Sequence, residues 1–231
     1  MKVKKAFCLF EQSGTFKNAF KAIGVDAYDY DVLNDFGETD FQIDLFDQIE
    51  KAYSGAVSIF DEMQGGVVMA FFPCTYFSQY NFALKRYDNR NYRGHDKRFV
   101  TERIIERHKK TFVFMEKLLQ LFQIAHEKDL KLCVENPYSR YFSFLYQYRP
   151  FEPQFIDGNR MDMGDYFEKP TQFYFVNIEA GEKPLFCSAR PSKKLSIDNI
   201  NKNKWERSRI SPEYAKNFIK YILQIENNNK E

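Results

Sequence analysis

The sequence predicts a single α/β domain with a mostly parallel sheet and helices on both faces. Short apolar runs typical of strands alternate along the 231 residues with segments of helical periodicity, as in successive strand–helix–strand units. Hydrophobic residues make up 44% of the chain and aromatic residues 18%, which is enough to form a full core. We therefore expect one domain over residues 1–226, followed by a frayed tail over residues 227–231.

The amino-terminal part predicts a strand–helix–strand unit. Strands are expected over residues 4–10 and 25–31, and Gly14, Thr15 and Phe16 open the helix between them. Such a crossover between parallel strands is right-handed. The glycine turn before the helix can direct backbone N–H groups toward a ligand.

The remaining strands and helices follow in a similar alternation. The pattern predicts a strand end over residues 41–44, a helix over 47–53, the most strongly apolar strand over 67–72, a helix over 111–126 and a strand over 130–134. After these come a predicted strand over 171–176, an irregular insert over about 177–206, and a helix over 211–226 with Pro212 in its first turn.

Two of these strands end at a proline. Pro73 cannot donate to a sheet ladder, so its strand should stop there and leave Cys74 in a loop at the carboxyl end. Open α/β sheets place their ligands at this end. The later strand ends in Glu135-Asn136-Pro137. Each proline alone could simply end a strand, but the two motifs together could bring a thiol nucleophile and an acid to one sheet edge.

Carboxylates follow successive predicted strands after the glycine turn. Asp29 and Asp31 end the second strand, where a carboxylate in such folds holds a pair of ribose hydroxyls. Asp44 ends the third strand, where an acceptor could read an adenine amine. Each aspartate alone could be a cap or turn residue. Three of them in this order favour a nucleotide-like cofactor.

Charge is nearly balanced over the whole chain, with 34 Lys and Arg against 32 Asp and Glu. The total therefore gives no indication of a nucleic-acid partner. Residues 85–110 differ, because basic residues outnumber acidic ones there and Tyr87 and Tyr92 lie among them. This composition fits a solvated loop and helix start as well as a segment that contacts phosphates.

The four cysteines show no C-x-x-C spacing, which predicts free thiols in a reducing compartment and no metal site. Cys8, Cys133 and Cys187 are expected to be small core residues, and Cys74 is the expected reactive thiol. No apolar run is long enough for a signal peptide or a membrane span. We therefore expect a soluble cytoplasmic protein.

The order of these motifs resembles that of the DNA cytosine-5 methyltransferase family, most closely its short, phage-type members. The first motif of that family is similar to the stretch from Leu9-Phe10 to Gly14-Thr15-Phe16, its proline–cysteine loop to residues 73–78, and its Glu-Asn-Pro motif to residues 135–137. A later glycine, lysine, threonine and aromatic pattern is similar to residues 164–173, with Lys169 and Thr171, and an Arg-Ser-Arg motif to residues 207–209. The Pro-Cys and Glu-Asn pairs are the specific part of the resemblance.

The resemblance implies a Rossmann-like S-adenosylmethionine-dependent methyltransferase fold. It also implies transfer of a methyl group from S-adenosylmethionine to C5 of cytosine in DNA. Cys74 would add to C6 of the base, Glu135 would hydrogen-bond or protonate N3, and Asn136 would orient the loop. The base would have to be flipped out of the duplex.

Further site residues are expected around these three. The expected cofactor-binding residues are Phe10, Gly14, Thr15, Phe16, Asp29, Asp44 and Pro73. The expected nucleic-acid contacts are Ser78, Arg90, Arg93, Lys97, Lys169, Arg207 and Arg209.

The chain departs from the family pattern at three positions of these motifs. Gln12 stands where the family usually has glycine, Cys8 where an acidic residue is common, and Phe72 where a second proline is common. The stretch between residues 176 and 207 is also too short for a large target-recognition domain. We therefore expect DNA binding with weak sequence preference, or specificity supplied by a protein partner. Two alternatives stay open: a catalytically silent nucleotide- or nucleic-acid-binding protein, and an enzyme that modifies a free pyrimidine nucleotide.

Overall fold

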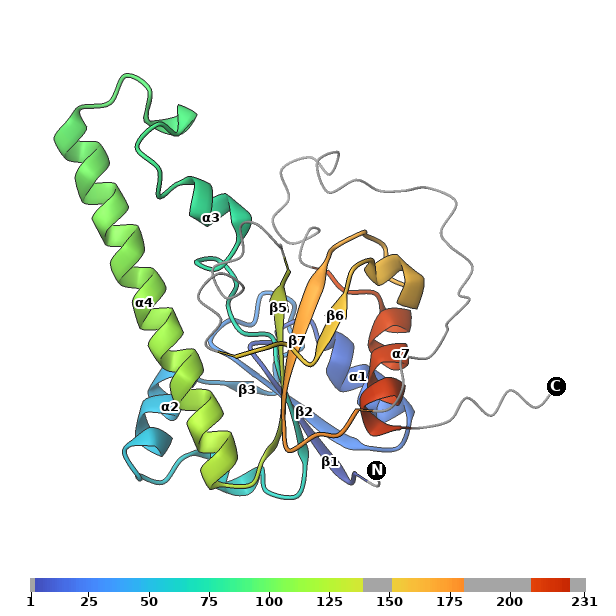
Figure 1. Cartoon of the computed structure of the whole chain (residues 1–231). Coiled ribbons are helices and arrows are strands. Elements are labelled where there is room, and N and C mark those ends of the chain that lie inside the picture. Colours follow the sequence, from blue (N-terminus) through green and yellow to red (C-terminus); the bar gives the residue numbers. More distant parts are fainter. Residues whose placement is uncertain (1–2, 139–150, 181–208, 225–231) are drawn as a thin grey trace.

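The computed structural model describes residues 3–138, 151–180 and 209–224. Within these ranges the chain forms a seven-stranded sheet of order β3-β2-β1-β4-β5-β7-β6 (Figure 1). The strands are β1 (Lys5–Leu9), β2 (Asp26–Asp31), β3 (Phe41–Gln42), β4 (Val67–Ala70), β5 (Lys131–Pro137), β6 (Phe155–Asp157) and β7 (Thr171–Val176).

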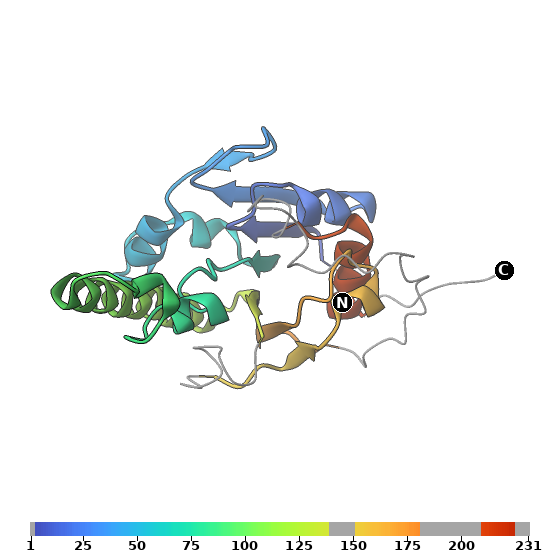
Figure 2. The same cartoon turned by 90° about the horizontal axis from the view of Figure 1, so that it is seen from above.

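Helices cover both faces of the sheet, with α1 and α7 on one face and α2 and α4 on the other (Figure 2). The α-helices are α1 (Thr15–Ala22), α2 (Leu45–Tyr53), α3 (Gln79–Ala83), α4 (Lys97–Glu127) and α7 (Pro212–Leu223). Short 3-10 helices are η1 (Ile59–Glu62), η2 (Arg90–Tyr92) and η3 (Arg160–Met163). None of the helices in the described ranges is long and apolar enough to cross a membrane.

The strands from β3 to β5 pair in parallel, and β7 runs antiparallel to its neighbours β5 and β6. The sheet is therefore mostly parallel, which confirms the predicted α/β class. The chain builds outward from β1 through β2 to β3, and then returns to place β4 on the other side of β1. The order thus reverses between β1 and β4, the position at which open α/β sheets bind ligands.

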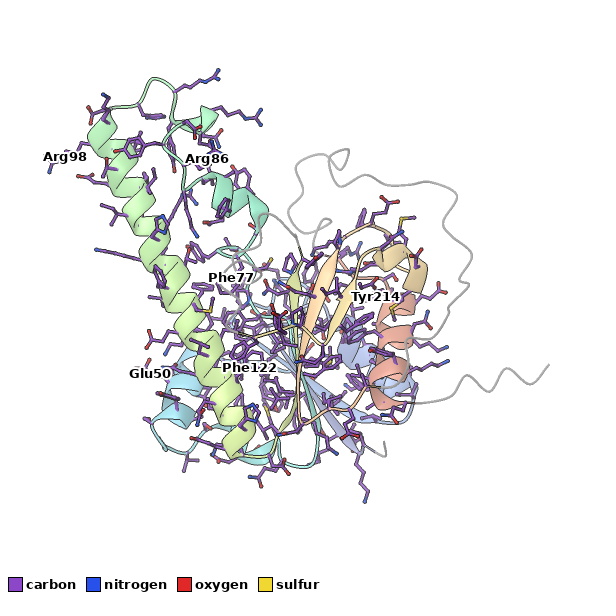
Figure 3. All side chains as sticks on the ribbon, in the orientation of Figure 1. Glu50, Phe77, Arg86, Arg98, Phe122 and Tyr214 are labelled. Atoms are coloured by element: carbon purple, nitrogen blue, oxygen red, sulfur yellow. The ribbon has the colours of Figure 1, made fainter. Side chains whose placement is uncertain are left out.

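Apolar side chains on alternate sides of each strand form two cores. Phe7 and Leu9 of β1 pack into the core beneath α2 and α4, and Ala6 and Cys8 pack into the core beneath α1 and α7. Figure 3 shows Phe122 of α4 and Tyr214 of α7, which belong to these opposite cores. Because both faces are buried, the strands appear in the sequence as continuous apolar runs rather than alternating ones.

The long helix α4 begins at Lys97, well before the predicted start at residue 111. Asp96 caps it, because its side chain accepts the N–H groups of Arg98 at 2.8 Å and Phe99 at 3.3 Å. The first half of α4 extends beyond the sheet (Figure 1), and between its start and Thr111 only Val100 is buried. Without a buried face this half has no apolar periodicity, so the sequence pattern did not indicate it.

Other differences from the prediction arise at short or edge elements. β5 continues through Glu135 and Asn136 because β7 pairs with it there, with Phe173 and Gln172 as the partners in register. The sequence pattern did not predict β6, α3 or the three 3-10 helices, each of which is five residues long or shorter. Most of the predicted insert and the predicted tail lie outside the described residues, as does Cys187.

A methyl group added at Gly66, just before β4, has no room. Its Cβ would lie 2.7 Å from Cε2 of Phe7 and 3.0 Å from the carbonyl oxygen of Lys5. We expect Gly66→Ala to lower the free energy of unfolding by about 1–3 kcal/mol, as overpacking does elsewhere. Gly158→Ala is the matched control, because no atom of the described residues other than its chain neighbours lies within 4 Å of its added Cβ. Urea denaturation of both variants measures the difference, and equal stabilities would contradict close packing of Gly66 against β1.

Candidate active site

A cavity of about 490 Å³ lies at the carboxyl ends of the parallel strands. It is formed by the turn after β1, the segment from the end of β2 to residue 36, the start of α2, the loop after β4, single residues of α4 and β5, and the segments directly before β7 and α7. The lining residues are Phe10, Glu11, Gln12, Ser13, Asp31, Val32, Leu33, Phe36, Asp44, Leu45, Phe46, Phe71, Phe72, Pro73, Cys74, Thr75, Phe114, Glu135, Lys169, Arg209 and Ile210. Both motifs that end at a proline therefore contribute to one cavity.

The loop after β4 presents Cys74 to this cavity. The last sheet contact before the loop is a hydrogen bond of 3.0 Å from the N–H of Phe71 to the carbonyl oxygen of Leu9. Beyond Pro73 the chain turns, because the carbonyl oxygen of Cys74 accepts the N–H of Phe77 at 3.0 Å. Cys74 is half-buried and lines the cavity. It lies in a loop at the carboxyl end of β4, where the sequence places it.

Asn136 fastens this loop to β5. Its side chain is completely buried, and Nδ2 donates a hydrogen bond of 3.2 Å to the carbonyl oxygen of Phe72. The bond fixes the backbone two residues before Cys74. Asn136 does not line the cavity itself, so its contact with the loop suits a positioning residue.

Glu135 of β5 lines the cavity, and the buried side chain of Arg160 lies next to it. Glu135 is 8% exposed, and its Oε1 lies 3.9 Å from Nη1 of Arg160, which is completely buried. This separation is too long for a hydrogen bond, so the two charges interact through space. Arg160 forms its ion pair with Asp165, and its guanidinium lies 4.7 Å from the ring centroid of Tyr214. Glu135 therefore lies next to a fixed positive charge.

Sequence reasoning missed Arg160. The residue belongs to the short helix η3, and no recognised motif surrounds it. An arginine is usually exposed, and only the three-dimensional structure shows that this one is buried with Asp165 and Tyr214. The sequence offered no signal that could have found it.

Apolar and acidic groups share the part of the cavity near β1 and β2. The ring of Phe10 meets the rings of Phe46 at 5.8 Å and Phe72 at 5.3 Å. Asp31, the last residue of β2, accepts the N–H of Leu33 at 2.8 Å, and burial raises the pKa of its carboxyl. Asp44 lines the cavity and caps α2, because it accepts the N–H of Phe46 at 2.9 Å. An aromatic wall thus adjoins two carboxylates.

Asp29 is placed differently from the sequence expectation. It is completely buried, does not line the cavity, and forms an ion pair of 3.1 Å with Lys17 of α1. It also accepts the N–H of Asp40 at 2.7 Å. Asp29 therefore connects α1 to the loop after β2, and Asp31 is the carboxylate of β2 that lines the cavity.

Residues 10–13 of the turn after β1 line the cavity, whereas Gly14, Thr15 and Phe16 do not. Gly14 has a φ of 64° and is the N-cap of α1, so it supplies no capping side chain. Phe16 is buried in the core, and neither it nor Thr15 reaches the cavity. Glu11 caps the helix instead, since its carboxylate accepts the N–H groups of Phe16 at 2.8 Å and Lys17 at 3.3 Å. Glu11 lines the cavity, although the sequence analysis did not select it.

The expected nucleic-acid contacts fall into two groups. Lys169 and Arg209 line the cavity, and Arg207 lies outside the described residues. The other contacts lie within, or directly before, residues 79–110, which project away from the sheet and which we call the basic arm (Figure 1). Ser78 caps α3 at the base of this arm by accepting the N–H of Asn81 at 3.4 Å. The remaining three, Arg90, Arg93 and Lys97, are exposed on the arm.

Three cysteines lie in the described residues, and all three are free thiols. Cys8 and Cys133 are completely buried, and burial raises the pKa of each well above its ordinary value. A thiol with a raised pKa is a poor nucleophile at neutral pH. Of the cysteines that the structure describes, Cys74 is therefore the one suited to chemistry on a ligand in the cavity.

The sheet order, with β7 antiparallel to both β5 and β6, defines a Rossmann-like α/β fold. No protein-family model matches the chain, and no curated protein matches it. Among solved structures, the chain is similar to the Entamoeba histolytica methyltransferase EhMeth, with a TM-score of 0.47 and 12% identity. The similarity covers 83% of this chain and 58% of that one, so this chain spans less than two thirds of that protein's length.

Glu11 should make the stability of the fold depend on pH. Burial raises its pKa from 4.5 to about 7, so the native protein holds this proton more tightly than the unfolded chain. Between these pH values stability therefore falls as pH rises, and the wild type should lose about 3 kcal/mol relative to Glu11→Gln. Urea denaturation at about pH 4.5 and about pH 8 measures this difference.

The exposed Glu127→Gln substitution is the matched control, because it should leave the dependence of the wild type unchanged. If the free energy of unfolding changes with pH in the same way for wild type and Glu11→Gln, the Glu11 carboxyl has the same pKa in the native and the unfolded protein, which would contradict the prediction.

Proposed function

We propose that this chain is a DNA cytosine-5 methyltransferase that transfers a methyl group from S-adenosylmethionine through a covalent bond between Cys74 and the base. The observation that carries the proposal is the cavity itself. A loop thiol and the buried carboxyl of Glu135 line it together with Asp31 and Asp44, next to an aromatic wall. This reaction needs a nucleophile, an acid and a subsite for a nucleotide-like cofactor.

The reaction begins at Cys74. Its thiolate adds to C6 of cytosine while the Glu135 carboxyl gives its proton to N3, so that charge does not accumulate on the ring. S-adenosylmethionine supplies the methyl group that C5 takes up. Loss of the C5 proton to a base then restores the C5–C6 double bond and expels Cys74, and N3 returns its proton to Glu135. Arg160 would stabilise Glu135 while the carboxyl is ionised.

The residues near β1 and β2 fit the cofactor. Phe10 and Phe46 offer faces for an adenine ring, Asp31 offers a carboxylate for the ribose hydroxyls, and Asp44 offers one for the adenine amine. Gln12 replaces the usual glycine of the turn, but its Oε1 accepts the N–H of Asp35 at 3.1 Å. Its side chain is thereby held at the loop after β2.

The basic arm is the proposed DNA-binding element. Several of its charges are already paired within the arm, as in the ion pairs Arg86–Asp88, Arg98–Glu102, Arg103–Glu106 and Lys110–Glu106. Arg90, Arg93 and Lys97 are exposed and have no ion pair within the described ranges. Figure 3 shows Arg86 and Arg98 at the end of the arm far from the sheet. Contacts there would reach phosphates, which carry no sequence information, so a protein partner could add specificity.

A free pyrimidine nucleotide is the second candidate substrate. Lys169 and Arg209 bring two positive charges to the cavity that holds Cys74 and Glu135. These charges could bind the phosphate of a free nucleotide as well as the phosphate of a nucleotide flipped out of a duplex. A catalytically silent binding protein is the third possibility, and the departure at Gln12 is the observation that favours it.

DNA that contains 5-fluorocytosine tests the covalent step. The C5 fluorine cannot leave as a proton does, so the wild type should remain bonded to the DNA after methyl transfer. We expect a covalent complex on a denaturing gel with wild type and none with Cys74→Ser, and Cys8→Ser is the matched control that keeps Cys74. An adduct that persists in Cys74→Ser would refute the assignment of the nucleophile.

In the same assay, Glu135→Gln should fold normally and form the adduct about 10²-fold or more slowly, because the positioned acid is lost. An unchanged rate would mean that Glu135 has no part in the addition. An adduct with free 5-fluorodeoxycytidine monophosphate, but none with DNA, would favour the second substrate.

Phosphate contacts by the arm should make DNA binding depend on salt. Charge reversal of Arg90, Arg93 and Lys97 together should reduce the slope of log affinity against log salt by up to about 3, because fewer counterions are released. Reversal of Lys4, Lys21 and Lys216 changes the net charge by the same amount, but at positions far from the arm. It should therefore leave the slope nearly unchanged. Fluorescence anisotropy with labelled duplexes measures both, and equal slopes would exclude the arm from binding.

A further inference from the structure

Glu11 fills the end of α1 that would otherwise hold an anion. In many strand–turn–helix units the first N–H groups of the helix bind a phosphate or carboxylate of the ligand. Here the N–H groups of Phe16 and Lys17 donate to the Glu11 carboxylate at 2.8 and 3.3 Å. The protein's own side chain thus takes the position that a ligand carboxylate could occupy.

Glu11 is also part of the cavity wall. It is 6% exposed, yet it lines the cavity between Phe10 and Gln12. A carboxylate screened from water acts on a nearby charge more strongly than one on the surface. A ligand that enters this part of the cavity therefore meets a fixed acidic group.

We propose that Glu11 is a specificity-determining residue for the cofactor, favouring a cationic sulfonium over the neutral thioether of the same molecule. The inference rests on the proposed function, because it places S-adenosylmethionine in this cavity. S-adenosylmethionine and S-adenosylhomocysteine differ by one methyl group and one positive charge. The ratio of their affinities therefore isolates the effect of the sulfonium. A preference for the cation would also help the demethylated product to leave.

The groups around Glu11 come from β1, β2, α1 and the turn before α1, where the hydroxyl of Ser13 donates to Oε1 of Glu11 at 3.4 Å. Cys8 of β1 hydrogen-bonds to its carboxylate, and Asp29 of β2 adds a negative charge. Lys17 of α1 forms ion pairs with Asp29 at 3.1 Å and Asp40 at 3.3 Å. Burial is the largest influence and raises the pKa of Glu11 to about 7. The other charged residues that line the cavity are Asp31, Asp44, Glu135, Lys169 and Arg209.

Calorimetry with both ligands at about pH 6 and about pH 8 tests the inference. As pH rises Glu11 ionises, so the preference of the wild type for S-adenosylmethionine over S-adenosylhomocysteine should grow by about tenfold. Glu11→Gln should show a smaller preference that does not change with pH. The glutamine keeps an oxygen that can accept the N–H of Phe16, so the cap of α1 should persist. If the variant is nevertheless unstable, the change of the wild-type affinity ratio between the two pH values still tests the inference.

Asp44→Asn is the matched control. It removes another cavity carboxylate, but one expected to contact the adenine amine, which is identical in the two ligands. Both ligands should then bind more weakly, with the ratio of their affinities unchanged.

A ratio that is the same in wild type and Glu11→Gln, and constant with pH, would overturn this role for Glu11 and leave the proposed function intact. Failure of the wild type to bind either ligand at millimolar concentration would remove the cofactor from the proposed function, and the present inference with it.

Discussion

The parallel pairing of β4 between β1 and β5 is the constraint on which the site depends. Met69 of β4 lies in register with Cys8 on one side and Cys133 on the other, so the three strands end at one edge of the sheet. That edge gathers the turn after β1, the loop with Cys74 and the side chain of Glu135 around one cavity. A slip of one residue in β5 would turn Glu135 to the opposite face and separate the thiol from the acid.

Buried charges then set the properties of the cavity from two directions. On the α1 side, Lys17 forms ion pairs with Asp29 and Asp40. Burial raises the pKa of the nearby Glu11 to about 7. On the β5 side, Arg160 lies within 3.9 Å of Glu135. Leaving a buried charge without a partner costs several kcal/mol, so each of these groups is held in place by the others. The site is thus preorganised in part by Lys17, Asp29 and Arg160, which do not line the cavity.

The sequence was sufficient for features that depend on local pattern, and insufficient for those that depend on pairing in space. Strands buried on both faces show as apolar runs, so the α/β class could be predicted, and Pro73 indicated the loop that carries Cys74. The first half of α4 lacks a buried face, and the reversed direction of β7 leaves no mark in its composition. Arg160 and Glu11 owe their roles to burial. Asp31 rather than Asp29 lines the cavity, and Asp29 instead forms the ion pair with Lys17. The sequence could not show which of the two aspartates Lys17 contacts.

The proposed reaction requires Cys74 at C6 and Glu135 at N3 to act together, so that C5 of cytosine can take up the methyl group. It is tested most directly by mass analysis of the nucleosides recovered from DNA after incubation with the protein and S-adenosylmethionine. We expect deoxycytidine heavier by one methyl group with the wild type, and unmodified deoxycytidine with Cys74→Ser. Equal amounts of methylated deoxycytidine from the two proteins, or none from a wild type that binds both DNA and S-adenosylmethionine, would contradict it.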